Sequence, residues 1–216
     1  MSLTLAAFRN PSQRAVNTIR LVVFLSALVP LARLATGAIV FPEWLGANPA
    51  EFITRATGDW ALRFLLLTLC VTPLRRVSGW SWLIRLRRML GLYAFFYACV
   101  HFSSYISFDH VFDVQAIFKD ILKRPFITVG FATLLLLLPL AVTSTNAMVR
   151  RLGAQRWRML HRLVYVLAPL AVLHFWWMVK RDVTEPAIYG VILAGLLATR
   201  IPWPKRGSAG SVPSSM

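Results

Sequence analysis

Three of the chain's four histidines lie in long apolar stretches, where an imidazole has little water to bind. His101 stands in FFYACVHFSSY, residues 95–105, and His161 and His174 share a second stretch, thirteen residues apart. His110 falls in a polar segment and is expected in a solvated loop. Ionisable side chains inside a membrane are candidates for function, because they are costly to place there.

His101 and His174 are expected at similar depth on two different helices. His101 precedes Asp109, the next charged residue, by eight residues, and His174 precedes Lys180 by six. A helix rises about 1.5 Å per residue, so the two imidazoles lie roughly 12 Å and 9 Å from the same expected edge. His161 lies about 20 Å farther from that edge.

Two histidines at matched depth suit the axial positions of a six-coordinate b-type haem, in which each imidazole supplies one neutral nitrogen to the iron. Neighbouring helices of a bundle can enclose the flat macrocycle. The simpler interpretation is that each histidine makes a hydrogen bond between helices, as polar residues in membrane bundles do. The depth-matched pair of His101 and His174 favours haem, and His161 adds a third candidate metal ligand.

The position of His161 calls for a bend in its helix. At about 100° per residue, His161 and His174 point roughly 140° apart on a straight helix and share no face. Pro169 lies between them, and a proline inside a helix kinks or unwinds it locally. We expect a kink at Pro169 if His161 takes part in a cofactor site.

A second haem would need another histidine on the helix of His101, but arginines stand in its place. Fourteen and thirteen residues before His101 the chain has Arg87 and Arg88. Arginine is a poor iron ligand but a good partner for phosphate or propionate groups. The site near His161 is therefore expected to hold a five-coordinate haem, a haem with another ligand, or a phosphate-bearing cofactor such as flavin mononucleotide (FMN). The alternative is that both arginines only anchor the helix end at the membrane surface.

The elements that position these residues are predicted to be membrane-spanning helices. The chain of 216 residues is 57% hydrophobic and 15% charged, whereas soluble domains carry roughly 25% charged residues. Its apolar blocks are too long for buried strands and indicate an all-α, polytopic membrane helix bundle. Six transmembrane helices are expected, at residues 17–40, 58–74, 89–108, 126–145, 158–179 and 186–203. The second and the sixth contain Arg63 and Arg200, which must reach an interface.

The charges favour an N-in, C-in topology. All eight acidic residues fall in segments on one side of the expected membrane, and sixteen of the 24 basic residues fall on the other. Basic residues in short loops mark the cytoplasmic side, and anionic lipids attract each of them by about 1 kcal/mol. The net charge of +16 is therefore attributed mainly to basic residues at the cytoplasmic surface of the membrane, where they face lipid headgroups. Nucleic acid binding is not expected.

Three regions are expected along the chain: a cytoplasmic N-terminal segment at 1–16, a six-helix haem-binding transmembrane domain at 17–203, and a disordered cytoplasmic tail at 204–216. The tail is small and polar, a composition that cannot bury a core. Within the domain, Tyr97 and Tyr105 lie about one helical turn before and after His101. They are expected either to reach the cofactor or to pack the bundle.

Four motifs of the chain resemble one family. They are RRMLGLYAFFYACVHFSSY (87–105), KRPFITVG (123–130), LPLAVTSTNAMVRRLG (138–153) and RWRMLHRLVYVLAPLAVLHFWWMVK (156–180). Together they are similar to the MsrQ (formerly YedZ) family, the haem-binding membrane subunits of bacterial MsrPQ systems, within the ferric-reductase-like transmembrane superfamily. The matching histidines are His101, His161 and His174, three of the four that the wider superfamily commonly has.

This resemblance implies a multi-pass protein of the bacterial inner membrane that transfers electrons and is not itself the catalytic reductase. Members of the family take electrons from the quinone pool or from a cytoplasmic flavin reductase and pass them outward through haem b. The acceptor is MsrP, a periplasmic molybdopterin enzyme that reduces methionine sulfoxide in oxidised envelope proteins. FMN is the second cofactor associated with the family.

Two other classes of function stay open on the sequence. One is a stand-alone ferric or quinone reductase, which would use the same metal ligands. The other is a non-redox membrane protein, either a small transporter or an assembly factor, whose histidines relay protons or pack helices.

Overall fold

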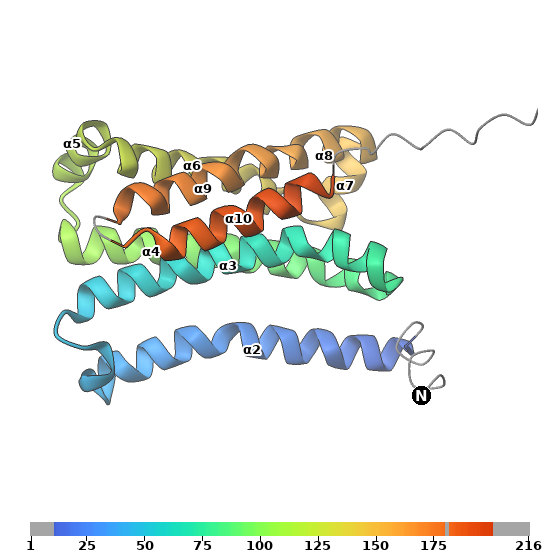
Figure 1. Ribbon diagram of the computed structural model, residues 1–216, viewed down its shortest axis with the longest axis horizontal. Helices are drawn as coiled ribbons and strands as arrows, with labels where there is room; N and C mark the ends of the chain where they lie inside the picture. Colours follow the sequence, from blue (N-terminus) through green and yellow to red (C-terminus); the bar gives the residue numbers. More distant parts are fainter. Residues whose placement is uncertain (1–10, 180–181, 201–216) are drawn as a thin grey trace, which may run out of the picture.

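The computed structural model describes residues 11–179 and 182–200, and every regular element within them is a helix. The six long helices are α2 (Gln13–Ile39), α3 (Pro49–Ser78), α4 (Ile84–Asp109), α6 (Pro125–Val142), α9 (Val164–Met178) and α10 (Thr184–Ala198). The short elements are η1 (Pro42–Leu45), η2 (Ser81–Leu83), α5 (Val114–Lys123), α7 (Asn146–Leu152), α8 (Ala154–Leu160) and η3 (His161–Leu163). The long helices run side by side, with η1 and α5 at one end of the bundle and α7 and α8 at the other (Figure 1). The prediction of an all-α membrane bundle is confirmed.

Four helical segments are long and apolar enough to cross a membrane. They are Gln13–Ile39, Ser81–Asp109, Pro125–Val142 and Ala154–Met178. Of the other two predicted spans, α3 is long but carries charged residues, and α10 is an apolar helix of 15 residues. Both belong to the bundle, because α3 packs along α4 and α10 packs against α9. The count of six spans and the N-in, C-in orientation remain predictions, and the predicted tail at 204–216 lies outside the described residues.

Local sequence signals begin and end these helices. The side chains of Ser12, Asn48, Asp113 and Thr145 accept hydrogen bonds from the first turns of α2, α3, α5 and α7. Such N-caps satisfy backbone N–H groups that have no partner within the helix. Gly79 ends α3 in the left-handed conformation with φ of 73°, which glycine adopts without steric cost.

Arg63 and Arg200, in the second and sixth predicted spans, are held by partners on neighbouring helices. Arg63 Nε donates to the hydroxyl of Tyr189 on α10, at 2.8 Å. Arg200, just after α10, donates to the hydroxyl of Tyr165 at 2.7 Å and to the backbone carbonyl of Leu69 at 2.6 Å. These bonds explain how the second and sixth predicted spans accommodate a cation, because each guanidinium has polar partners within the bundle.

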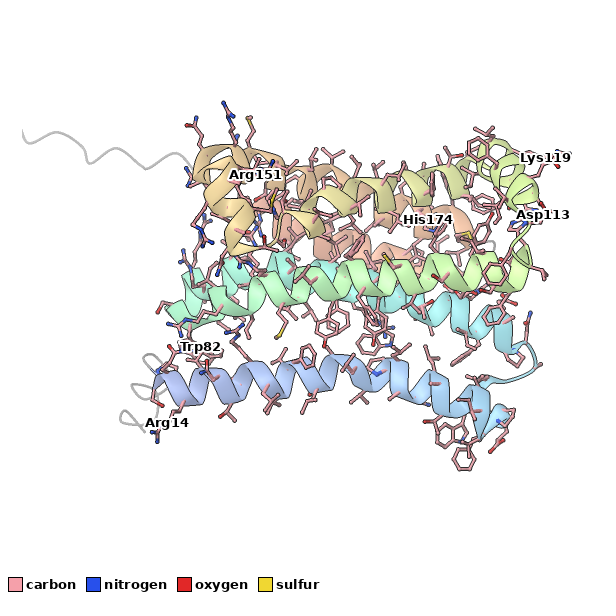
Figure 2. All side chains as sticks on the ribbon, turned by 180° about the vertical axis from the view of Figure 1, so that it is seen from behind. Arg14, Trp82, Asp113, Lys119, Arg151 and His174 are labelled. Carbon is pink, nitrogen blue, oxygen red and sulfur yellow. The ribbon has the colours of Figure 1, made fainter. Side chains whose placement is uncertain are left out.

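Two tyrosines of α4 attach α2 to the rest of the bundle. The ribbon of α2 stands apart from the others (Figure 1), and side chains fill the space between them (Figure 2). The Tyr97 hydroxyl donates to the carbonyl of Ala27 at 2.7 Å and accepts from the N–H of Leu31 at 3.2 Å. The Tyr93 hydroxyl donates to the carbonyl of Phe24 at 2.8 Å. Of the two roles expected for Tyr97, the structure shows the packing role.

We predict that Tyr97→Phe loosens α2 more than Tyr93→Phe does. Tyr97 is fully buried, and its hydroxyl serves a donor and an acceptor of α2, whereas the Tyr93 hydroxyl serves one acceptor. A buried polar group left without a partner costs about 1–3 kcal/mol. Unfolding of the purified variants by heat in detergent measures the difference. Equal unfolding temperatures for the two variants would contradict this role.

Candidate functional site

The structure brings His101 and His174 together from α4 and α9. Their ring centroids lie 6.2 Å apart, and the ring planes make an angle of 70°. The labelled His174 lies in the half of the bundle nearer to Asp113 and Lys119 (Figure 2). The two histidines that the sequence places at similar depth in the membrane are therefore neighbours in the bundle.

Each of these imidazoles is oriented by one backbone carbonyl. His101 Nδ1 lies 2.8 Å from the carbonyl oxygen of Thr54, and His174 Nδ1 lies 2.6 Å from that of Phe126. A carbonyl oxygen only accepts, so Nδ1 carries the proton in both rings. The lone pair of the neutral ring then lies on Nε2, which is the state in which histidine binds a metal.

Two glycines make room for the rings, and sequence reasoning missed both. A Cβ atom on Gly58 would lie 3.1 Å from Cε1 and Nδ1 of His101. A Cβ atom on Gly130 would lie 2.6 Å from Cε1 and 2.8 Å from Nδ1 of His174, closer than real contacts allow. The glycines are therefore required by close approach, since any side chain there would push the imidazole away.

The two histidine sites repeat one arrangement. In α3 the accepting carbonyl belongs to Thr54, and the glycine follows four residues later as Gly58. In α6 the carbonyl belongs to Phe126, and the glycine again follows four residues later as Gly130. Residues four apart lie on one helix face. Each helix therefore places, on one face, a carbonyl that accepts a hydrogen bond beside a glycine that has no side chain. We name each such pair a histidine cradle: Thr54 with Gly58, and Phe126 with Gly130.

The distance between the two rings suits a metal ion that lies between them and takes its other ligands from a cofactor. A metal–imidazole bond of about 2.0 Å on either side places two ring centroids roughly 6 Å apart. No group of three or more His, Cys, Asp or Glu side chains suited to a metal ion occurs among the described residues. Two axial nitrogens without further protein ligands fit iron that is held in a macrocycle. The residues present therefore fit haem.

His161 lies away from this pair, in η3 at the opposite half of the bundle. Its ring stacks on Trp157 with centroids 3.9 Å apart, and its Nε2 lies 3.2 Å from Thr143 Oγ1. Because the Thr143 hydroxyl donates to the carbonyl of Pro139 at 2.6 Å, it accepts from His161 Nε2. The ring is half-buried against protein and does not join His101 and His174 in one site.

The helical segment that carries His161 and His174 changes type before Pro169. α9 stays α-helical through Pro169, and the change in helix type falls at η3, from His161 to Leu163. A 3₁₀ turn advances about 120° per residue instead of about 100°. Three such residues reduce the angle between His161 and His174 from about 140° to roughly 80°. The turn thereby directs His161 inward without a break at the proline.

Arg87 and Arg88 gather with His161 at the end of the bundle that holds α7 and α8. Both guanidinium groups lie within electrostatic range of His161. Arg88 donates to the side-chain oxygen of Asn146 at 2.6 Å, and Arg87 is half-buried beside Arg200. The five predicted site residues thus divide into an imidazole pair and a separate basic group of Arg87, Arg88 and His161.

His110 and Tyr105 join one polar network with Asp120. The Tyr105 hydroxyl donates to Asp120 Oδ2 at 2.8 Å, and His110 Nε2 lies 3.2 Å from the same oxygen. Arg124 Nε pairs with Asp120 Oδ1 at 2.8 Å. The His110 side chain is only 14% exposed, so the expectation of a solvated loop histidine is wrong. Its partner Asp120 lies on α5, a helix that is not among the six predicted spans.

The fold and the imidazole pair define a class, polytopic helical membrane proteins with a paired-histidine site. The family described as "Ferric reductase like transmembrane component" matches residues 57–172. That range contains Gly58, His101, Gly130 and His161 and ends two residues before His174. No solved structure matches the chain.

Proteins named "Protein-methionine-sulfoxide reductase heme-binding subunit MsrQ" are similar to nearly the whole chain. That of Herminiimonas arsenicoxydans is 58% identical over 196 residues, 90% of this chain and 89% of its own. That of Ralstonia nicotianae is 53% identical over 90% of both chains, and that of Azospira oryzae is 49% identical over 94% of this chain and 90% of its own. The chain therefore belongs to the MsrQ family, within the ferric-reductase-like transmembrane proteins, and is a multi-pass protein of the bacterial inner membrane.

We predict a graded response when glycines of the bundle are replaced by alanine. Gly130→Ala should destabilise the protein by about 1–3 kcal/mol, as overpacking does, and Gly58→Ala should destabilise it less. Gly91→Ala is the control, because a Cβ there would meet Thr68 at an ordinary 3.6 Å and alanine favours a helix. Thermal unfolding of the three variants in detergent gives the order. A Gly130→Ala protein as stable as Gly91→Ala would refute the cradle.

Proposed function

We propose that the chain is the haem-binding, electron-transferring membrane subunit of a methionine sulfoxide reductase system. Electrons enter from the quinol pool or from a cytoplasmic flavin reductase. They leave to a periplasmic molybdopterin enzyme of the MsrP type, which repairs oxidised periplasmic proteins. The observation that carries this proposal is the facing pair of His101 and His174, each with Nδ1 bound to a carbonyl and Nε2 available. The names of the relatives support it.

His101 and His174 are the residues that would hold the iron of a b-type haem, through their free Nε2 atoms. The haem iron supplies reversible one-electron chemistry when it is bound. The chain's own contribution is to hold two neutral imidazoles in fixed orientation, because the bonds to Thr54 and Phe126 remove the choice of tautomer and limit ring rotation. Such bonds also make the coordinating nitrogen a better donor.

The basic group of Arg87, Arg88 and His161 is proposed to serve the cytoplasmic end of the path. Guanidinium groups bind phosphates through paired hydrogen bonds, so Arg87 and Arg88 suit the phosphate of FMN. The stacked pair of Trp157 and His161 lies within the same end of the bundle, and a flat aromatic surface suits an isoalloxazine ring. His161 is a metal ligand only if its bond to Thr143 opens.

The high identity to methionine sulfoxide reductase subunits favours this function over a stand-alone ferric or quinone reductase. A non-redox role accounts for less of the geometry. One hydrogen bond suffices for a histidine that only joins two helices, and Nδ1 provides it in both rings. The two remaining Nε2 atoms make no hydrogen bond among the described residues, and the ring centroids lie 6.2 Å apart, which favours a shared metal.

We predict that His101→Ala and His174→Ala each lose most of the bound haem, whereas His161→Ala keeps it. The first two substitutions remove an axial nitrogen, and the third removes a ring that bonds Thr143 instead. Visible spectra of the purified proteins, oxidised and then reduced with dithionite, measure haem per chain. His161→Ala is the matched control on the helix segment of His174. Full haem content in both His101→Ala and His174→Ala would reject the ligands, and no haem in the wild-type protein would reject the function.

We predict that a quinol reduces the haem of the wild-type chain in proteoliposomes, and that the periplasmic catalytic subunit with methionine sulfoxide reoxidises it. The α band of reduced haem follows both steps in time. A cytoplasmic flavin reductase with NADH replaces the quinol in a parallel sample. If neither donor reduces the haem, the proposed direction of transfer is wrong even where haem binding stands.

A further inference from the structure

α5 lies at the end of the bundle opposite α7 and α8 (Figure 1). It exposes several large apolar side chains. Val114, Phe118 and Leu122 follow one another at intervals of four residues and therefore form one stripe. Phe118 is 66% exposed and Leu122 is 72% exposed. A run of exposed apolar side chains of this size marks a surface that contacts another apolar phase.

Three faces follow one another around α5. At about 100° per residue, the face toward the bundle holds Ile117, Asp120 and Ile121, all buried. The apolar stripe of Val114, Phe118 and Leu122 comes next, directly beside the buried face. A polar, exposed face completes the turn, with Gln115, Lys119 and Lys123. This order, core then apolar then basic, is that of a helix lying in a membrane interface.

The turn before α5 extends the apolar stripe. Val111 and Phe112 have positive φ angles of 46° and 64°, a conformation that is strained for a β-branched or bulky residue. Their side chains are 79% and 68% exposed. The strain is held by backbone bonds from Phe112 N–H to Ile106 and from Asp113 N–H to His110. The chain thus keeps a costly turn that directs two large apolar groups outward.

Buried polar contacts fix the orientation of α5. Asp120 binds Tyr105 and His110 of the α4 segment and pairs with Arg124 at the start of α6. The hydroxyl of Thr128 donates to the carbonyl of Ile121. These bonds tie α5 to both neighbouring helices, so the apolar stripe cannot roll inward.

The level of α5 is that of the lipid headgroups. Arg124 is both the last cap of α5 and the first cap of α6. α6 has 18 residues, a rise of about 27 Å, which nearly equals the hydrocarbon thickness of about 30 Å. The C-terminal end of α5, at Lys123, therefore lies at the edge of the hydrocarbon, where α6 begins.

We propose that α5 and the turn before it form an interfacial anchor that binds the phospholipid surface. The stripe of Val111, Phe112, Val114, Phe118 and Leu122 enters the boundary between headgroups and acyl chains. Lys119 and Lys123 fit anionic headgroups such as those of phosphatidylglycerol. A lipid occupant is favoured over a protein because α5 joins α6 directly at Arg124, and α6 is long and apolar enough to cross the membrane. The anchor holds the outer end of α4, and with it the depth of His101.

The test compares neighbouring positions of α5 in a bilayer without any partner protein. Phe118→Cys and Lys119→Cys carry a nitroxide in a background of Cys70→Ala and Cys99→Ala, in nanodiscs of phosphatidylethanolamine and phosphatidylglycerol. Collisions with oxygen report hydrocarbon, and collisions with a soluble nickel chelate report water. We expect oxygen to relax the label at 118 severalfold more than nickel does, and the reverse at 119.

Two outcomes overturn the anchor. Equal access of nickel to both labels shows that α5 stands in water. Access of nickel at 118 that disappears when the catalytic subunit is added shows a protein-docking surface instead. Should the cysteine-free background fail to fold by circular dichroism, benzoylphenylalanine at 118 or 119 of the native chain gives the same comparison. Phospholipid adducts at 118 and not at 119 support the anchor, and their absence at both positions overturns it.

Discussion

The contact between an imidazole and the backbone of a neighbouring helix is the constraint on which the site depends. His101 and His174 each need a carbonyl for Nδ1 and a place beside it without a side chain. Only a glycine one turn after the accepting residue meets both needs, and α3 and α6 each supply one. The spacing of α3 from α4, and of α6 from α9, follows from this close approach. The remaining helices close the bundle around these two pairs.

Several charged groups elsewhere in the bundle follow a related pattern, in which a partner on another helix accompanies the group into apolar surroundings. Arg63 finds Tyr189, Arg200 finds Tyr165, and Asp120 finds a histidine, a tyrosine and an arginine. Since apolar packing distinguishes poorly between helix neighbours in lipid, such bonds are what select one arrangement. The membrane bundle is thus specified by a small number of directional contacts between otherwise similar apolar helices.

Much of the fold could be predicted from the sequence, because apolar length and charge placement are local properties. Each of the six predicted spans overlaps a helix among the described residues, and matched depth places His101 and His174 at one level, although only the structure shows that the rings lie together. The cradles could not be predicted, since Gly58 and Gly130 acquire meaning only once their helices are known to lie against the histidines. His110 was misjudged because its partner Asp120 lies ten residues away on a short amphipathic helix. The 3₁₀ turn at His161 could not be predicted, because no proline or glycine marks it in the local sequence.

The doubling of the cradle has a consequence for biogenesis. α3 and α4 form one hairpin with one imidazole and its carbonyl, and α6 and α9 form a second with the other. The ribosome completes the first hairpin more than fifty residues before His174 is made. A cofactor that needs both rings can therefore be captured only when the second hairpin closes on the first. Loading of such a cofactor would therefore follow the insertion of both hairpins, and a chain with either half misplaced would present one ring without the other.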